Sequence, residues 1–195
     1  MKLLIFTLLL SFLSVSSLFA ETREWNISSD EFNALGTLTA PTTVNGLTIY
    51  ATADKSVVVE PNGKELDGMV FTTRMKLGGA GSIAAGAEYR VVSIDVSGNA
   101  TISVAAISSS SSTDREMLLI NGNGDTLSTK PVLGAEITMV VYDYVGPATK
   151  LYLASQTSGI NLYYIKAEDV EGGVATKEIV FVKSATTQND SIVIA

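Results

Sequence analysis

The sequence predicts an all-β protein, an antiparallel sandwich or barrel, and three observations support this. From Leu47 onward, short β-branched and apolar runs alternate at even spacing with clusters of Gly, Asn, Asp and Ser, as expected for many short strands joined by turns. Helical periodicity over ten or more residues is absent after the first twenty residues. The stretch Met69–Gly79 alternates mostly apolar with polar side chains, the pattern of a half-buried strand.

The two ends of the chain differ from its middle. Residues 1–20 combine Lys2, an apolar run at Leu3–Leu13 and small residues ending at Ala20, which predicts a signal peptide. The apolar run is short for a membrane span, so a retained anchor is the less favoured alternative. We therefore expect a secreted, periplasmic or cell-surface protein whose β-sandwich occupies residues 21–168. Residues 169–195 resemble a linker with an apolar end, which suggests a fragment of a longer protein.

Composition excludes several classes of site and partner. The 195-residue chain contains neither Cys nor His, which rules out disulfides, a Ser-His-Asp triad and the usual zinc sites. Its net charge is −7, so we expect neither nucleic acid nor an anionic membrane as a partner. We also expect a monomer, because a single domain of this length can bury its own core.

Taken in order, the first predicted element after the signal peptide is a short helical turn. Ser28 and Glu31 have the spacing of a capping box within residues 21–34. Trp25, the only Trp, is expected to pack on the edge of the sandwich. Stacking of its ring on a sugar is the alternative.

About nine strands are expected beyond this turn. They lie at residues 47–51, 56–60, 69–77, 89–96, 100–107, 116–121, 137–144, 150–154 and 160–167. Turn residues separate them at 62–63, 67–68, 97–99, 121–124 and 158–159. The turn Ser97-Gly98-Asn99 predicts a hairpin between the two strands that flank it.

The strand at residues 69–77 carries the main candidate site. Alternation places Arg74 and Lys76 on the same exposed face. Arg can bind a carboxylate through two parallel hydrogen bonds, and Lys adds a point charge. Arg90 and Arg115 begin two other strands and could join them. We expect both cations of the pair to stand unneutralised in solvent, and the alternative is that they form ordinary surface ion pairs with nearby acids.

Tyrosines are the second set of candidate binding residues. Alternation places Tyr163 and Tyr164 on opposite faces, so at most one belongs to the core, and it places Tyr142 and Tyr144 together on one face. An exposed Tyr beside Arg would suit a sugar, whereas packing along strand edges is the favoured alternative. The polar run at residues 108–113 is a predicted loop that could lie near the binding end of the sandwich.

Metal and cofactor chemistry is not expected. Oxygen side chains alternate along Asn121–Asp125, but the bidentate Glu of a calcium loop is missing. A plain hairpin turn explains this segment better, and structural calcium is the alternative. No catalytic residue is assigned, because no set of acid and base groups is recognisable.

Several segments together resemble a known family. They are Asn45-Gly-Leu-Thr-Ile-Tyr-Ala51, Phe71-Thr-Thr-Arg-Met-Lys-Leu-Gly-Gly79, Arg90-Val-Val-Ser-Ile-Asp-Val96, Leu151-Tyr-Leu153 and Gly159-Ile-Asn-Leu-Tyr-Tyr-Ile-Lys166. In this order they resemble the non-catalytic β-sandwich modules attached to secreted bacterial pectate lyases and other pectin-degrading enzymes, over residues 25–168. The resemblance implies a jelly-roll module that binds pectin-like polysaccharide. The 27 residues after residue 168 in this sequence are too few for a β-helix lyase domain, so we do not expect the resemblance to carry lyase activity to this chain.

The sequence thus predicts a non-catalytic module that binds acidic, uronate-containing polysaccharide such as polygalacturonate. The ligand-binding residues that the resemblance implies are Arg74 and Lys76, extended by Arg115 and Tyr164. Two alternatives stay open. One is a structural or surface module without a sugar ligand. The other is a small polysaccharide lyase of sandwich fold, which the lack of His disfavours.

Overall fold

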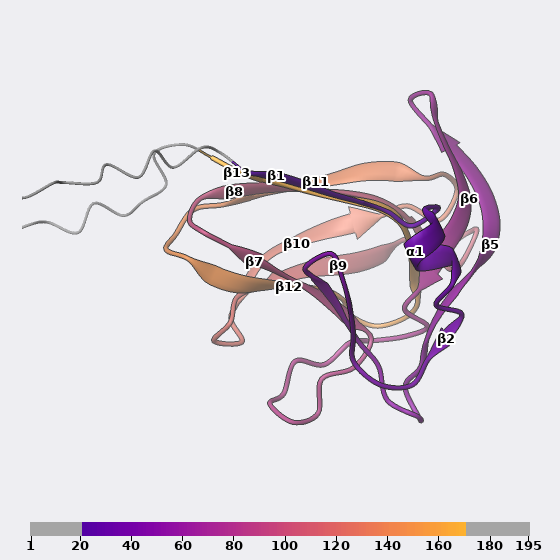
Figure 1. Cartoon of the computed structure of the whole chain (residues 1–195). Helices are drawn as coiled ribbons and strands as arrows, with labels where there is room; N and C mark the ends of the chain where they lie inside the picture. Colours follow the sequence, from indigo (N-terminus) through magenta and orange to yellow (C-terminus); the bar gives the residue numbers. More distant parts are fainter. Residues whose placement is uncertain (1–20, 171–195) are drawn as a thin grey trace, which may run out of the picture.

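A computed structural model describes residues 21–170, which form two antiparallel β-sheets packed face to face (Figure 1). The predicted signal peptide and most of the linker-like segment lie outside the described residues. One sheet contains β1 (Thr22–Asn26), β2 (Thr37–Leu38), β5 (Val57–Leu66), β6 (Met69–Lys76), β8 (Ala100–Ser108), β11 (Thr138–Tyr144) and β13 (Ile160–Asp169). The other contains β3 (Thr42–Val44), β4 (Leu47–Tyr50), β7 (Val91–Val96), β9 (Arg115–Ile120), β10 (Thr126–Val132) and β12 (Thr149–Ser155).

The strand order is that of a jelly roll, which confirms the predicted fold. The seven-stranded sheet has the order β11-β8-β13-β6-β5-β2 with β1 added beside β13, and the six-stranded sheet has the order β10-β9-β12-β7-β4-β3. From β6 onward, every connection except β9–β10 passes from one sheet to the other. Four strands of one sheet, β6, β8, β11 and β13, thus alternate along the chain with four strands of the other, β7, β9, β10 and β12. This arrangement is that of a jelly roll.

The predicted hairpin across Ser97-Gly98-Asn99 is wrong. Strand β7 pairs with β4 and β12, whereas β8 pairs with β11 and β13 in the opposite sheet. Gly98 does not have the positive φ that the tight hairpin turns use. A connection of three residues is long enough to cross the roughly 10 Å between packed sheets, so the turn chemistry was compatible with either outcome.

Two tight hairpins occur where Asn or Asp precedes Gly. Asp67 and Gly68 have φ values of 50° and 81° and join β5 to β6, as the predicted turn requires. Asn45 and Gly46 have φ values of 47° and 83° and join β3 to β4, a hairpin that was not predicted. Both have the signs of φ of a type I′ turn.

The Asn62-Gly63 pair does not form the predicted turn. Both residues lie inside β5, where the register with β6 shifts between Pro61 and Lys64. An extra residue in one strand of an antiparallel pair bends that strand and redirects its side chains. This irregularity therefore changes which residues of β5 face the outside of the sheet.

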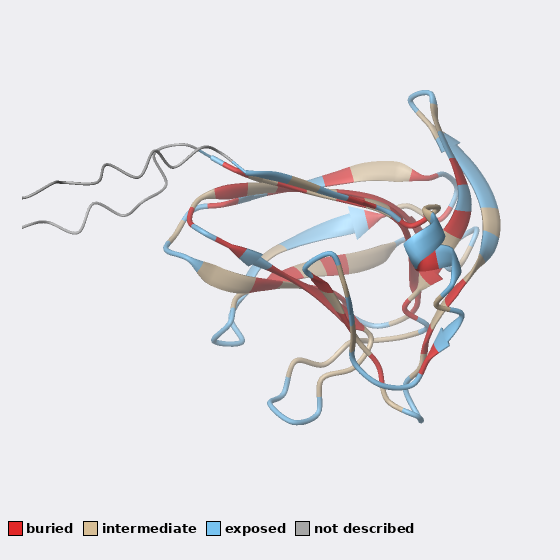
Figure 2. Ribbon diagram, in the orientation of Figure 1, coloured by how far each residue is buried: buried red, intermediate tan, exposed pale blue. Residues whose placement is uncertain are grey.

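The hydrophobic core lies between the two sheets. In Figure 2, buried stretches alternate with less buried ones along several strands. The predicted alternation in β6 is confirmed: Phe71, Thr73 and Met75 are buried, and Val70 is 67% exposed. The pair on β11 behaves likewise, because Tyr142 and Tyr144 are both buried and the intervening residue is exposed.

A short helix, α1 (Asp30–Asn33), confirms the predicted helical turn, but the capping box is wrong. The N-cap is Ser29, whose hydroxyl bonds to the carboxylate of Glu31. The hydroxyl of Ser28 instead accepts hydrogen bonds from backbone N–H groups of Thr72 and Thr73 in β6, at 2.9 and 3.2 Å. Within residues 21–170, no helix has the length and apolar character needed to cross a bilayer.

Trp25 packs as a structural residue, as predicted, but it is part of the main core rather than of the edge of the sandwich. It is 2% exposed, and its indole N–H donates to the backbone oxygen of Asn45 at 3.0 Å. Because its ring faces are covered, Trp25 is not an accessible sugar-stacking surface.

Candidate functional site

The outer face of the seven-stranded sheet brings three strands together around one residue of β13. Asn161 is the register partner of Lys76 on β6 and of Ile107 on β8. Side chains directly opposite each other in a sheet share a face, and Arg74 shares the face of Lys76 because it lies two residues away. The prediction that Arg74 and Lys76 share a face is therefore confirmed.

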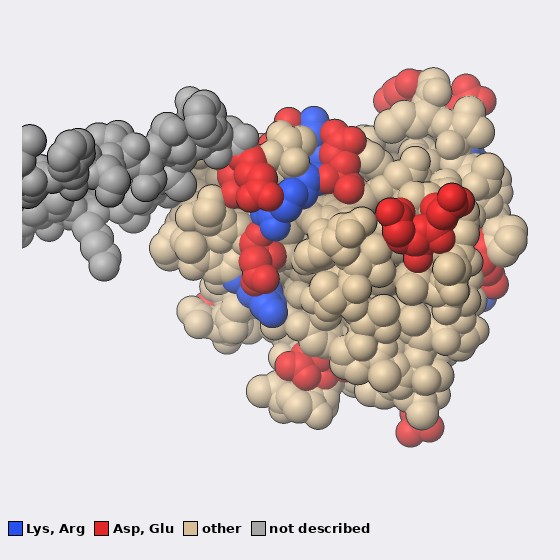
Figure 3. Space-filling model, viewed as in Figure 1, with Lys and Arg blue, Asp and Glu red and all other residues tan. Residues whose placement is uncertain are grey.

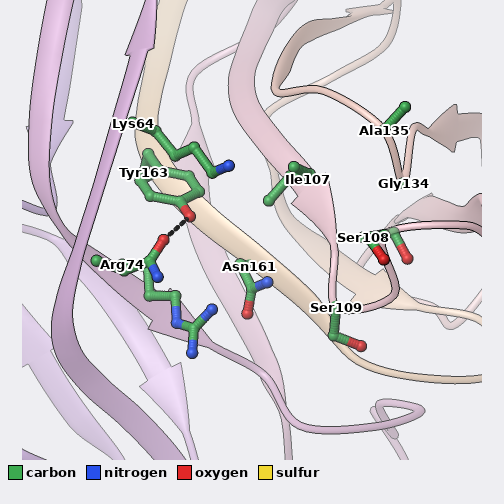
Figure 4. A pocket seen from close by; sticks show the side chains of 11 residues that line it. Lys64, Arg74, Ile107, Ser108, Ser109, Gly134, Ala135, Asn161 and Tyr163 are labelled. Atoms are coloured by element: carbon green, nitrogen blue, oxygen red, sulfur yellow. Dashed lines mark hydrogen bonds between the residues drawn. The ribbon is translucent and has the colours of Figure 1, made fainter.

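A groove of about 220 Å³ lies on this face (Figure 4). The residues that line it are Asn62, Lys64, Arg74, Ile107, Ser108, Ser109, Ser111, Gly134, Ala135, Asn161 and Tyr163. One wall comes from the β5–β6 hairpin, the floor from β13, and the other wall from β8 and the loops that follow β8 and β10. The predicted loop at residues 108–113 thus lies at the groove.

Lys64 is a cation of the groove that sequence reasoning missed. It is exposed, and the irregularity at Asn62-Gly63 brings this part of β5 to the groove. Among residues 21–170, Lys64 has no acidic partner within salt-bridge distance. The groove lining contains two cations and no Asp or Glu. The signal was available in the sequence, but Asn-Gly is read first as a turn rather than as a bulge.

Arg74 and Lys76 are not unneutralised, so that expectation is wrong. Nε and Nη2 of Arg74 donate to Oε1 of Glu60, with Nε at 3.0 Å, and Nζ of Lys76 lies 4.0 Å from the same oxygen. The reason is the register, since Glu60 lies directly opposite Arg74 in the β5–β6 ladder. The hydrogen bond from Arg74 lowers the pKa of the Glu60 carboxyl.

Tyr163 forms part of the groove floor. Its ring is fully buried against Phe71, with ring centroids 5.7 Å apart, and its hydroxyl donates to Oδ1 of Asn62 at 2.5 Å. Burial raises the pKa of the Tyr163 hydroxyl, so the group stays protonated at neutral pH. It therefore acts as a hydrogen-bonding group that holds β5 to the floor of the groove.

Tyr164 lies outside the groove lining. It is half-buried beside the small cluster that contains Phe71 and Tyr163. Burial, with a smaller contribution from Glu24, raises the pKa of Tyr164 to about 12. Only Tyr163 of the two tyrosines is fully buried, as the prediction that at most one belongs to the core requires.

The other predicted cations also lie outside the lining of the groove. Arg115 is the first residue of β9 in the six-stranded sheet and is half-buried. Arg90 precedes β7 with a φ of 53° and places its guanidinium against Gly78 and Gly79. The structure therefore brings only Arg74 of the predicted set into the groove, with Lys76 beside it.

Most other basic side chains on the sheet surfaces are paired. Nζ of Lys166 lies 2.8 Å from Glu168, and Nζ of Lys150 lies 4.0 Å from Asp95. Figure 3 shows basic and acidic side chains next to one another around β1 and β13. The lining of the groove thus differs from the surface around β1 and β13, because it contains cations and no acid.

The Asn121–Asp125 segment forms the β9–β10 turn. Oδ1 of Asn121 accepts hydrogen bonds from backbone N–H groups of Asn123 and Asp125, each at 2.9 Å. The plain-turn alternative accounts for these contacts. Within the described part of the chain, no three His, Cys, Asp or Glu side chains are grouped as a metal site.

Comparison with known proteins yields structural likenesses only. No model of a known protein family matches the chain. No curated protein matches it in sequence. The CBM22-1 xylan-binding domain of Xyn10C from Paenibacillus barcinonensis has a TM-score of 0.44 and 14% identity, covering 76% of this chain and 94% of that one.

Two further solved structures are similar at the same level. The C-terminal CBM6 of LamC, a laminarinase from Zobellia galactanivorans, has a TM-score of 0.34 and 15% identity, over 75% of this chain and 98% of that one. The module CBM6cm-2 of Cellvibrio mixtus lichenase 5A, in complex with cellotriose, has a TM-score of 0.36 and 16% identity, over 70% and 98% of the two chains. Likenesses at this level identify neither a ligand nor a site in this chain.

Proposed function

We propose that this protein binds an acidic, uronate-containing polysaccharide of the polygalacturonate type, without cleaving it, in the groove on the outer face of the seven-stranded sheet. The proposal depends on one observation. Lys64 and Arg74 both line a groove whose lining contains no acidic residue, although the net charge of the whole chain is −7. An anionic ligand can bind an acidic protein only where the local charge is positive, and these two cations provide such a place.

Each part of the groove has a distinct role in this proposal. Lys64 and the edge of Arg74 that does not face Glu60 bind a sugar carboxylate. The serine hydroxyls of residues 108–111 and the apolar side chain of Ile107 face the sugar ring from the opposite wall. Lys76, next to the groove, contacts the following unit of the polymer. Arg115 and Tyr164 are proposed as contacts for a longer chain only.

Affinity electrophoresis tests the proposal. Wild-type protein should be retarded in a native gel that contains polygalacturonate and should migrate freely in a gel that contains fully methyl-esterified pectin. The double variant Lys64→Gln with Arg74→Gln should lose the retardation. The matched control is Lys55→Gln with Lys130→Gln, which changes the net charge equally at two exposed lysines outside the groove. Equal retardation of the two double variants would refute the groove as the binding site.

A second candidate is a structural module without a sugar ligand, and one observation favours it. Arg74 and Lys76 sit around Glu60, as ordinary surface ion pairs would. This candidate predicts that wild-type protein is not retarded by any polysaccharide and binds nothing on a glycan array. The same gel therefore decides between the two. The lyase alternative is checked on the same preparation by following the absorbance of unsaturated uronates.

A further inference from the structure

The floor of the groove contains a buried amide with an unused hydrogen-bonding atom. Asn161 is 2% exposed, and its Oδ1 has no hydrogen-bond partner among the described residues. Buried polar atoms are nearly always paired, and leaving one unpaired is costly. In Figure 4 this side chain lies between Arg74 and Ser109.

The position of this amide is fixed by the sheet. Strand β13 is hydrogen-bonded to β6 on one side and β8 on the other, and both register partners of Asn161 come from these strands. Because the backbone is held on both sides, the amide stays beside the guanidinium of Arg74 on the outer face. A ligand whose carboxylate contacts Arg74 would present its neighbouring ring atoms to Asn161.

We propose that Asn161 hydrogen-bonds a free ring hydroxyl of the bound uronate, so that the ligand class is a uronate whose free ring hydroxyls are not acetylated. This inference rests on the proposed function and adds a requirement to it. A hydroxyl can both donate and accept a hydrogen bond. It can therefore bond to the Asn161 side chain whether the amide oxygen or the amide nitrogen faces the ligand. An acetylated hydroxyl can no longer donate to Oδ1 and adds bulk in a small groove.

Two polymers separate this requirement from simple charge attraction. Polygalacturonate carries both carboxylates and free ring hydroxyls on each sugar unit, whereas polyacrylate carries carboxylates alone. Titration calorimetry with both is run on wild-type protein and on Asn161→Leu, a substitution of similar size that removes the amide. The control is Asn123→Leu in the β9–β10 turn, where the side chain is exposed.

We expect Asn161→Leu to bind polygalacturonate about three- to tenfold more weakly, the range for one neutral hydrogen bond, and polyacrylate unchanged. Asn123→Leu should leave both affinities unchanged. If Asn161→Leu binds polygalacturonate as wild type does, or loses both polymers equally, the hydroxyl contact is refuted while anion binding in the groove stands. If wild-type protein binds neither polymer, the proposed function itself fails.

A second measurement does not depend on the folding of the variant. Wild-type protein is titrated with polygalacturonate that has been O-acetylated at its ring hydroxyls and keeps its carboxylates. Binding of the acetylated polymer that is weaker by at least threefold than binding of the unacetylated polymer supports the hydroxyl contact. Equal binding of acetylated and unacetylated polymer by wild-type protein overturns it.

Discussion

Glu60 lies directly opposite Arg74 across the β5–β6 ladder, and two nitrogens of the guanidinium donate to a single oxygen of the Glu60 carboxylate. This carboxylate also lies 4.0 Å from Lys76. Arg74 is therefore held in place at the edge of the groove by an acid of its own chain. An incoming sugar carboxylate would meet a cation that is oriented but partly neutralised.

Removing the charge of Glu60 should strengthen binding of an anionic polymer. In Glu60→Gln, Arg74 and Lys76 keep their places without a neighbouring negative charge, so we expect polygalacturonate affinity to rise about two- to fivefold at low ionic strength. The rise should diminish as salt is added. Calorimetry at two salt concentrations measures it, with Glu65→Gln, an exposed acid of the same strand, as the control. Unchanged affinity in Glu60→Gln would show that Arg74 does not contact the ligand.

The same ion pair predicts how stability depends on pH. The Arg74 guanidinium lowers the pKa of Glu60 from its usual 4.5, so the folded state favours the ionised carboxylate. This contribution is fully present above pH 4.5 and is lost as pH falls through the lowered pKa. Thermal unfolding from pH 7 downward should show a small advantage of wild type over Glu60→Gln that is constant above pH 4.5 and declines as pH falls below it. An advantage that grows as pH falls below 4.5 would contradict the assigned pair.

Loss of the Tyr163 hydroxyl should destabilise the fold. Tyr163→Phe removes the hydrogen bond to Asn62 and leaves the amide oxygen of Asn62 unpaired, so we expect the free energy of unfolding to fall by about 1 kcal/mol. Tyr164→Phe is the control, because Tyr164 is only half-buried, and its effect should stay within about 0.5 kcal/mol. Urea denaturation compares the two, and equal effects would mean that the Tyr163–Asn62 bond does not stabilise the fold.

A methyl group at Gly134 should disturb the wall of the groove. A Cβ there would lie 2.5 Å from the backbone oxygen of Ser110 and 3.0 Å from backbone atoms of Thr113. We expect Gly134→Ala to destabilise the protein by about 1–3 kcal/mol and to weaken polysaccharide binding, because the wall must shift. Gly63→Ala is the control, since its Cβ would meet only the oxygen of Phe71 at 3.9 Å. A stable Gly134→Ala protein with wild-type affinity would contradict the close packing of this wall.

The single Trp offers a check on which surface binds the ligand. Trp25 is 2% exposed and its ring is covered by the core. Its fluorescence should therefore resist quenching by iodide, stay unchanged when polygalacturonate is added, and shift to longer wavelength only on unfolding. A ligand-dependent change in the emission would place the sugar near Trp25 rather than in the groove.

The fold class could be predicted because it depends on local patterns. Alternation in β6 and β11 shows which side chains face a core, and evenly spaced turn residues indicate many short strands. Which strands pair is not a local property, so the connection at residues 97–99 was compatible with both a hairpin and a crossing between sheets. Short strands such as β2 and β3 were missed because two or three residues carry too little pattern.

The candidate site was predicted only in part, for a reason that concerns register. The pattern of β6 showed that Arg74 and Lys76 share a face, but nothing within that strand shows that Glu60 lies opposite. That pairing depends on the Asp67-Gly68 turn, the length of β5 and the irregularity at residues 62–63 together. Lys64 joins the groove through the same irregularity, which a sequence pattern does not separate from a turn.

The pairing of Thr22 with Glu168 brings both ends of the described chain to one pole of the molecule, whereas Asn161 lies near the opposite end of β13 (Figure 1). Seven residue steps of extended strand separate Asn161 from Glu168, roughly 23 Å. A protein that spans residues 21–170 can therefore be coupled to a sensor chip or a bead at residue 21 or residue 170, at the pole away from the groove. Immobilised and free protein should then give the same dissociation constant for a given oligosaccharide.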